Sequence, residues 1–142
     1  MHYDLVDRVL ELSPERIVTI KQVSMAEEYL QDHFATFPVL PGVMMLEAMV
    51  QAGRKLLESR NPASLSRPPL VLGKVRALKY GRFVKPGAAL RVEVVLHKTL
   101  DGEGWELKGE GVVMEAGAVG EPATAVSGRF ILREARVPAA VN

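Results

Sequence analysis

The pattern of apolar residues predicts one long helix in the first half of the chain. Residues 43–50 are apolar at every position except Glu47, and further charged residues follow only from Arg54 onward. Such a run indicates a helix that is buried all round. Pro41-Gly42 precedes it, and proline is tolerated at a first helical position because its missing N–H would have no partner there. Asn61-Pro62 follows, so we predict a helix from Val43 to about Ser59.

The pattern after residue 70 favours strands. Residues 71–76 begin the series, residues 90–96 alternate between apolar and polar for the first half of the run, and residues 105–115 and 124–134 are long enough for two more strands. Pro86-Gly87 and Asp101-Gly102 lie between these runs and are typical of turns. Antiparallel strands in sequence order can form a sheet that curls around a single helix and buries it. The predicted class is α+β.

Two shorter elements precede the long helix. β-branched residues between Ile17 and Val23 favour a strand. Ser24 and Glu27 have the spacing of a capping box, which predicts a short helix through Leu30. With 142 residues the chain fits one domain, residues 1–142, in which about 135–142 form a loose tail.

Composition narrows the function classes. The formal net charge is +1, from 18 basic and 17 acidic residues, so no strong field favours nucleic acid or membrane. There is no cysteine, which excludes disulfides, thiolate metal sites and a cysteine nucleophile. No signal peptide or membrane-spanning run is expected, and a cytoplasmic location fits these features.

Candidate chemistry is concentrated in residues 32–51. His33 precedes the helix, Gly42 lies at its start, where backbone N–H groups are free, and Glu47 lies in its most apolar part. Elimination of water from a 3-hydroxyacyl thioester needs a base, an acid and a donor to the thioester oxygen, and these three groups have those properties. The alternatives are a capping or packing histidine and a solvated helix stripe formed by Glu47, Gln51, Arg54 and Glu58.

The same segment resembles the 3-hydroxyacyl-[acyl-carrier-protein] dehydratases of type II fatty acid synthesis, the FabZ-like family. The matching positions are His33-Phe34, Pro38, Pro41-Gly42-Val43, Glu47-Ala48 and Gln51. Residues 5–9 look like the opening strand of the family, and residues 81–87 are similar to its phenylalanine and proline-glycine segment. The chain departs from the family at Ala35-Thr36, where proline-glycine is usual.

The resemblance implies a hotdog fold, a curved antiparallel sheet wrapped around a central helix. It implies reversible dehydration of a (3R)-3-hydroxyacyl group on acyl carrier protein to the trans-2-enoyl product. His33 would be the base at C2 and Glu47 the acid, and Gly42, Val43, Gln51 and Phe83 would bind substrate. Active sites shared within a homodimer are implied, possibly in a hexameric trimer of dimers. No metal or organic cofactor is implied.

The acidic carrier protein would need a basic surface near the substrate entrance. The candidates share one segment of the sequence: Lys74, Arg76, Lys79, Arg82 and Lys85. An ordinary solvated strand face is an equal interpretation of this clustering. For Phe83, a core position is slightly favoured over a place in the tunnel.

Three other functions remain open. A hotdog acyl thioesterase also places an acid on the central helix but uses it for hydrolysis. A dehydratase that also isomerises the double bond typically has aspartate where this chain has Glu47. A non-catalytic subunit that binds an acyl carrier is compatible with Ala35-Thr36 in the histidine loop. Turnover of a thioester distinguishes these functions. A dehydratase forms a conjugated enoyl thioester, a thioesterase releases a free thiol, and a binding subunit does neither.

Overall fold

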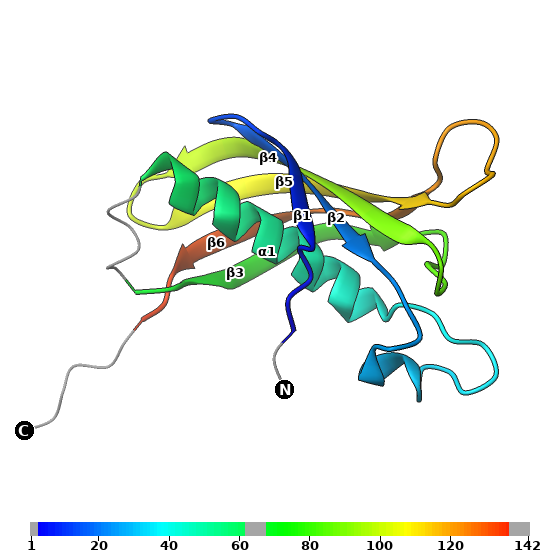
Figure 1. Cartoon of the computed structure of the whole chain (residues 1–142). Helices are drawn as coiled ribbons and strands as arrows, with labels where there is room; N and C mark the ends of the chain where they lie inside the picture. Colours follow the sequence, from blue (N-terminus) through cyan, green and yellow to red (C-terminus); the bar gives the residue numbers. More distant parts are fainter. Residues whose placement is uncertain (1–2, 62–67, 137–142) are drawn as a thin grey trace, which may run out of the picture.

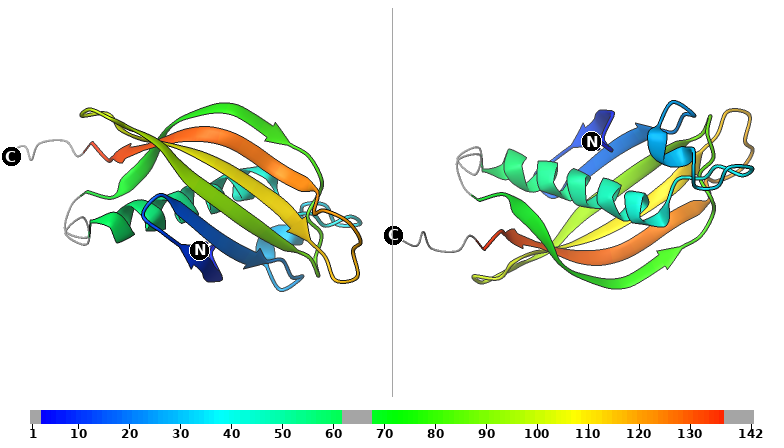
Figure 2. Two further views of the ribbon diagram at one scale, coloured as in Figure 1. Left: turned by 90° about the horizontal axis from the view of Figure 1, so that it is seen from above. Right: turned by 90° about the horizontal axis from the view of Figure 1, so that it is seen from below.

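A curved antiparallel sheet wraps around one long helix (Figures 1 and 2). The computed structural model describes residues 3–61 and 68–136, so the predicted tail from residue 137 onward lies outside the described residues. The elements are β1 (Arg8–Leu12), β2 (Arg16–Gln22), a 3-10 turn η1 (Glu28–Leu30), α1 (Gly42–Arg60), β3 (Leu70–Tyr80), β4 (Ala89–Leu100), β5 (Gly104–Met114) and β6 (Thr124–Glu134).

The strands form a six-stranded sheet in the order β1-β2-β4-β5-β6-β3, with every neighbouring pair antiparallel. Strand β3 follows the helix in sequence, yet it pairs with β6 at the far edge of the sheet. Strands β1 and β3 therefore form the two edges. The helix lies across the concave side (Figure 2), and this arrangement confirms the predicted α+β class and hotdog fold.

Helix α1 begins and ends close to the predicted positions. Pro41 is its N-cap residue, and the carbonyl oxygen of Pro41 accepts hydrogen bonds from the N–H groups of Met44 and Met45 at 3.0 and 3.2 Å. Because proline fixes φ near the helical value, it is well suited to this entry into the helix. The helix ends at Arg60, just before Asn61.

Only one face of α1 is buried in the chain. Met49, Ala52 and Leu56 are completely inaccessible and pack in the core. On the opposite side, Val43 is 69% exposed, and Glu47 is half-buried. The expectation of a helix buried all round is therefore wrong for a single chain, because the sheet covers only the side of the helix that faces it.

Two glycines allow the helix and sheet to approach closely. A Cβ atom at Gly109 of β5 would lie 2.7 Å from the sulfur of Met49. A Cβ atom at Gly53 of α1 would lie 3.1 Å from the ring of Phe130. Phe130 is 1% exposed and is the largest of the fully buried side chains. Small residues at these positions therefore set the spacing between α1 and the centre of the sheet.

The amino-terminal segment differs from the expectation. The resemblance placed a strand at residues 5–9, whereas β1 begins at Arg8. Residues 3–7, here named the N-terminal arm, lead into it in irregular conformation. Leu5 and Val6 are only 2% and 7% exposed. Their apolar character therefore reflects packing of the arm in the fold rather than pairing in the sheet.

The predicted capping box before η1 is formed only in part, because the N-cap residue of η1 is Glu27, which makes no side-chain capping hydrogen bond. The Ser24 hydroxyl accepts a hydrogen bond from the Ala26 N–H at 3.2 Å, and the Glu27 carboxylate accepts one from the Ser24 N–H at 3.4 Å. The helix that follows is only the single turn Glu28–Leu30, anchored by the buried Leu30. The chain then enters the loop that contains His33.

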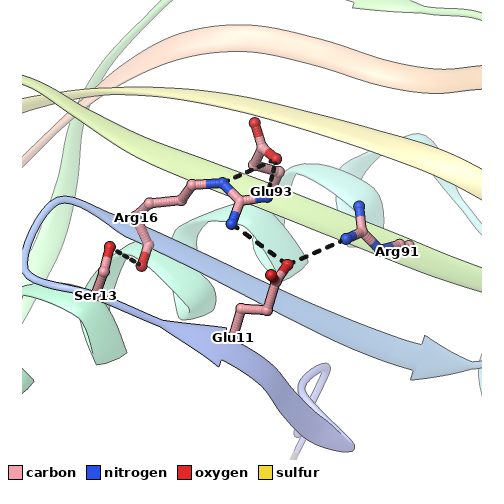
Figure 3. A network of polar contacts seen from close by, with 5 residues as sticks. All are labelled: Glu11, Ser13, Arg16, Arg91 and Glu93. Carbon is pink, nitrogen blue, oxygen red and sulfur yellow. Dashed lines mark hydrogen bonds and ion pairs between the residues drawn. The ribbon is translucent and has the colours of Figure 1, made fainter.

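The outer face of the sheet carries an ion-pair network that joins β1, β2 and β4 (Figure 3). Arg16 contacts Glu93 at 2.6 Å and Glu11 at 3.3 Å, and Arg91 contacts the same Glu11 oxygen at 3.3 Å. Since Val92 and Val94 of β4 lie in the core, the intervening Glu93 points away from the helix. The network therefore links the β1 edge to β2 and β4 on the side of the sheet that faces away from the helix.

We expect Phe130→Ala to lower the free energy of unfolding by about 3–5 kcal/mol, because it leaves a cavity between the helix and the sheet. Denaturant unfolding monitored by circular dichroism measures the change. Val119→Ala is the matched control, since Val119 is fully exposed and its truncation should change the stability by less than about 0.5 kcal/mol. Equal effects of the two substitutions would contradict this account of the core.

Candidate active site

His33 lies in the loop between η1 and α1, and Val39 holds both its backbone and its ring. The carbonyl oxygen of His33 accepts a hydrogen bond from the Val39 N–H at 2.9 Å. The ring Nδ1 atom lies 3.0 Å from the carbonyl oxygen of Val39. Phe34 stacks on the ring with a centroid distance of 4.5 Å. The half-buried imidazole is thus fixed on two sides.

The contact with Val39 determines which ring nitrogen of the neutral histidine can act as a base. A carbonyl oxygen only accepts hydrogen bonds, so the interaction requires the proton to be on Nδ1. In the neutral ring this leaves Nε2 with a free lone pair. The loop therefore presents a proton acceptor at a defined atom.

The histidine loop closes through a tight turn. The N–H and carbonyl groups of Phe34 and Phe37 pair reciprocally at 3.1 Å, so Ala35-Thr36 forms the tip of the turn. Farther along, the N–H of Leu40 donates to the carbonyl oxygen of Val84 at 2.8 Å. Backbone pairing at both places keeps the loop folded although the proline-glycine typical of the resembled family is absent.

Glu47 lies on the second turn of α1, on the face that the sheet does not cover. Its Oε1 atom accepts a hydrogen bond from Nε2 of Gln51 at 3.2 Å, one helical turn farther along. Gln51 also donates to the carbonyl oxygen of Tyr3 at 2.9 Å and accepts from the Leu5 N–H at 2.8 Å. Glu47 and Gln51 therefore lie on one side of the helix, as the sequence predicts. This side does not face only solvent, because Gln51 binds the N-terminal arm.

Gly42 is the first residue of α1, and its backbone N–H belongs to the helix turn whose donors have no partner within the helix. A Cβ atom here would lie 2.9 Å from two ring carbons of Tyr80. Burial raises the pKa of the Tyr80 phenol. Sequence reasoning missed Tyr80, because no periodic pattern indicates that the end of β3 lies against the start of α1.

Phe83 is not a core residue, which corrects the favoured expectation. Its side chain is 57% exposed and meets Phe37 edge to face, with ring centroids 5.9 Å apart. The ammonium group of Lys85 lies 5.0 Å from the centre of the Phe37 ring. Both aromatic rings border a cavity of about 570 Å³, together with Arg82, Lys85 and residues 113–115 and 118–123.

The basic residues predicted to bind a carrier protein do not form one cluster. Arg82 and Lys85 line the cavity next to Phe37 and Phe83. Lys74 lines a different cavity of about 670 Å³, beside the turn between β4 and β5. Lys74 and Tyr80 are separated along β3 by roughly 20 Å. Arg76 and Lys79 are exposed along the strand between them.

A buried ion pair anchors the chain just before the histidine loop, and sequence reasoning also missed it. Lys21 of β2 contacts Glu27 at 2.6 Å and Asp7 of the N-terminal arm at 3.5 Å. Burial lowers the pKa of Lys21, but the hydrogen bonds and charges of Glu27 and Asp7 together outweigh it, so the pKa is raised. Burial, followed by the nearby Glu27 carboxylate, raises the pKa of Tyr29, whose buried hydroxyl makes no hydrogen bond of standard geometry to the described residues.

The described residues contain no group of three or more histidine, cysteine, aspartate or glutamate side chains that could hold a metal ion. No helix among residues 3–61 and 68–136 is long and apolar enough to span a membrane. Near α1 lie an oriented imidazole, a half-buried carboxyl group and helix N-terminal N–H groups. Together they can transfer protons and polarise a carbonyl group.

Comparison with solved structures supports the fold class. The dehydratase heterocomplex ApeI:P from Xenorhabdus doucetiae superposes with a TM-score of 0.63 at 14% identity, covering 92% of this chain and 98% of that one. An acyl-CoA hydrolase from Agrobacterium tumefaciens gives a TM-score of 0.61 at 12% identity, covering 92% of this chain and 47% of that one. These likenesses show a hotdog fold, and His33 and Glu47 are its candidates for acid–base chemistry.

Sequence comparison gives the family. The model of the FabA-like domain matches residues 1–119. The 3-hydroxyacyl-[acyl-carrier-protein] dehydratase FabZ of Oenococcus oeni is 43% identical over 101 residues, which are 70% of this chain and 71% of that protein. The FabZ of Symbiobacterium thermophilum is 45% identical over 91 residues, 63% of each chain. The chain belongs to the FabA-like family, which confirms the resemblance.

We expect Tyr29→Phe to change stability in a pH-dependent way. At pH 7 the free energy of unfolding should stay within about 1 kcal/mol of wild type, because the buried hydroxyl makes no hydrogen bond of standard geometry to residues 3–61 and 68–136. A tyrosine whose pKa is higher in the folded state than in the unfolded state stabilises the folded protein at pH values below the unfolded-state pKa, which is about 10. This contribution is lost as the pH rises above that unfolded-state pKa, because the unfolded chain then releases the proton more easily. The variant should therefore lose less stability than wild type between pH 9 and 11.

Denaturant unfolding at several pH values checks this expectation. Tyr3→Phe is the control for removal of a hydroxyl, since Tyr3 meets the Tyr29 ring edge to face at 5.7 Å and is more exposed. Parallel stability curves for wild type and Tyr29→Phe up to pH 11 would contradict the assignment.

Proposed function

We propose that this chain is a cytoplasmic 3-hydroxyacyl-[acyl-carrier-protein] dehydratase, a hydro-lyase of fatty acid synthesis. Membership of the FabA-like family and the FabZ relatives support this activity. The observation that carries the proposal is the Val39 contact, which leaves Nε2 of His33 as the proton acceptor beside the start of the helix that bears Glu47.

The proposed reaction needs two proton transfers. Nε2 of His33 removes a proton from C2 of the acyl group, and the electron pair of that C–H bond becomes the C2–C3 double bond. The C3–O bond breaks as Glu47 donates a proton to the hydroxyl, which leaves as water. Return of the proton from the imidazolium to Glu47 restores both groups. The reverse sequence hydrates the enoyl thioester.

The Gly42 N–H is the proposed donor to the thioester oxygen. Negative charge develops on this oxygen as the C2 proton leaves, and a helix N-terminus favours negative charge. Val43, exposed on the same turn, would contact the substrate. The mechanism needs no metal or organic cofactor, because the protein groups supply each proton and the carbonyl donor.

We place the entrance for the carrier-bound thioester at the cavity lined by Phe37, Phe83, Arg82 and Lys85. The two cations suit the phosphate of a phosphopantetheine arm and the acidic surface of acyl carrier protein. The aromatic pair offers an apolar wall to the arm. Lys74 lies in the other cavity and is the weakest candidate for the same docking surface.

A homodimer with shared active sites is part of the proposal, with a trimer of such dimers as a further assembly. Strand β3 is an edge of the sheet, and an edge strand has unpaired backbone groups that a second copy can use. Val43 and Tyr80, at the adjoining end of the helix and strand, are 69% and 50% exposed. Pairing across β3 would cover this surface and bring a second histidine loop toward Glu47.

Hydration of an enoyl thioester, measured as loss of its conjugated absorbance, tests the activity. We expect turnover with acyl-carrier-protein substrates, and a fall of about a hundred-fold or more in kcat for His33→Ala and for Glu47→Gln. Unchanged melting temperatures would show that both variants fold. Glu58→Gln, on the same helix stripe but farther along, is the matched control. Full activity of Glu47→Gln would contradict the assigned acid, and release of free thiol would favour a thioesterase.

Complementation tests the shared site. We expect a mixture of His33→Ala and Glu47→Gln, refolded together from denaturant, to regain about a quarter of the wild-type activity. Random pairing makes about half of the dimers heterodimers, and one of the two sites in each heterodimer carries both intact residues. Refolding together removes slow subunit exchange as an obstacle. Sedimentation establishes that dimers form. A dimeric mixture without activity would show that each chain forms its own site.

A further inference from the structure

Gln51 uses its whole side-chain amide within the protein. The backbone N–H of Leu5 can only donate, so the atom of Gln51 that faces it at 2.8 Å must be the carbonyl oxygen. The NH2 group then faces the other way. One of its hydrogens is shared with the carbonyl oxygen of Tyr3 at 2.9 Å and the other with Oε1 of Glu47 at 3.2 Å.

This orientation determines which oxygen of Glu47 can carry a proton. In a neutral carboxylic acid the carbonyl oxygen is the stronger acceptor, so the hydrogen bond from Gln51 favours Oε1 as the carbonyl oxygen. The proton of the acid is then on Oε2, the oxygen without this contact. If the Gln51 amide were reversed, its carbonyl oxygen would face Glu47 and hold the proton on Oε1.

The arm that fixes Gln51 is itself well anchored. Leu5 is 2% exposed. The N–H of Asp7 donates to the carbonyl oxygen of Ile20 at 2.9 Å, and the Asp7 carboxylate lies 3.5 Å from Lys21. Lys21 also binds Glu27, which precedes the histidine loop. The arm therefore contacts both the helix that bears Glu47 and the segment that leads to His33.

We propose that Gln51, locked by the N-terminal arm, is a positioning residue that directs the proton of Glu47 to Oε2. This inference rests on the proposed function of Glu47 as the acid. It replaces the substrate-binding role that the family resemblance implied for Gln51, since the amide has no hydrogen left for a substrate. The arm acts as an orientation lock, because a reversed Gln51 amide would place its NH2 group against the N–H of Leu5, where two donors cannot form a hydrogen bond.

Substitution of Gln51 tests the role by separating kcat from KM. Gln51→Met keeps the length of the side chain and removes all three hydrogen bonds. Gln51→Glu keeps the acceptor for Leu5 but removes the donor to Glu47. We expect both variants to lower kcat about ten- to a hundred-fold with KM unchanged, as a misdirected proton lowers the rate and not the affinity. A raised KM with unchanged kcat would restore the substrate-binding role and overturn the proposal.

Arg54→Met is the matched control. Arg54 lies three residues farther along α1, and its Nε atom donates to the carbonyl oxygen of Leu70 at 3.0 Å. Its loss therefore removes a similar tie between the helix and an extended segment, without contact to Glu47 or Gln51. We expect this variant to lower the melting temperature as Gln51→Met does and to keep wild-type kcat. An equal fall in kcat would show that loosening of the helix explains both effects.

Replacement of Leu5 by its α-hydroxy acid tests the lock without changing any side chain. The resulting ester lacks only the N–H that faces Gln51, so we expect a fall in kcat in the same direction as for Gln51→Met. Exchange rates of the Gln51 side-chain hydrogens, measured by NMR, should rise in the ester whether or not the protein turns over thioesters. Slow exchange and unchanged kcat in the ester would refute the lock, whereas absence of turnover in wild type would refute the proposed dehydratase function.

Discussion

Burial of one face of α1 against the sheet is the constraint on which the site depends. Met49, Ala52 and Leu56 must face the core, and Gly53 and Gly109 allow the helix to lie close to the sheet. A helix with one face fixed has no freedom to rotate about its axis. Residues on the opposite face are therefore fixed as well, and this places Glu47 and Gln51 away from the sheet although they contribute little to the core.

The position of the helix along its axis is fixed at its amino-terminal end. Leu40 pairs with Val84 of the segment after β3, and Pro41 then begins the helix. The neighbouring Val39 holds the imidazole of His33 through its carbonyl oxygen. Because adjacent residues perform these three tasks, His33, the proposed base, and the helix that bears Glu47, the proposed acid, share one rigid connection. Both backbone hydrogen bonds and the contact of the His33 ring with Val39 contribute to it.

The local elements could be predicted from the sequence because local patterns produce them. Pro41-Gly42 begins the helix, Asn61 follows it, and Ser24 and Glu27 make part of the predicted capping box just before η1. His33, Gly42 and Glu47 could be selected because their types suit the chemistry and their order matches a family. The FabA-like match confirms the family, and their roles in catalysis remain predictions.

Features that depend on distant segments were not predictable. Tyr80 reaches Gly42 because β3 passes to the far edge of the sheet and returns to the helix start. The N-terminal arm looked like a strand because buried irregular backbone and strands both need apolar residues at Leu5 and Val6. Lys74 was grouped with Arg82 because neighbours in sequence along an extended strand become distant in space.

The distribution of exposed apolar residues argues for an incomplete site in a single chain. Phe34, Val43, Tyr80 and Phe83 are each at least half exposed, and all lie on the histidine loop, the start of α1 or the end of β3 and the segment after it. Single exposed apolar residues are common, but large side chains gathered around candidate catalytic groups indicate a surface that is covered in use. Exclusion of water would also strengthen the interaction of Gly42 with a developing negative charge. The proposed second copy, paired along β3, would meet both requirements at once, because this edge strand ends beside the candidate site.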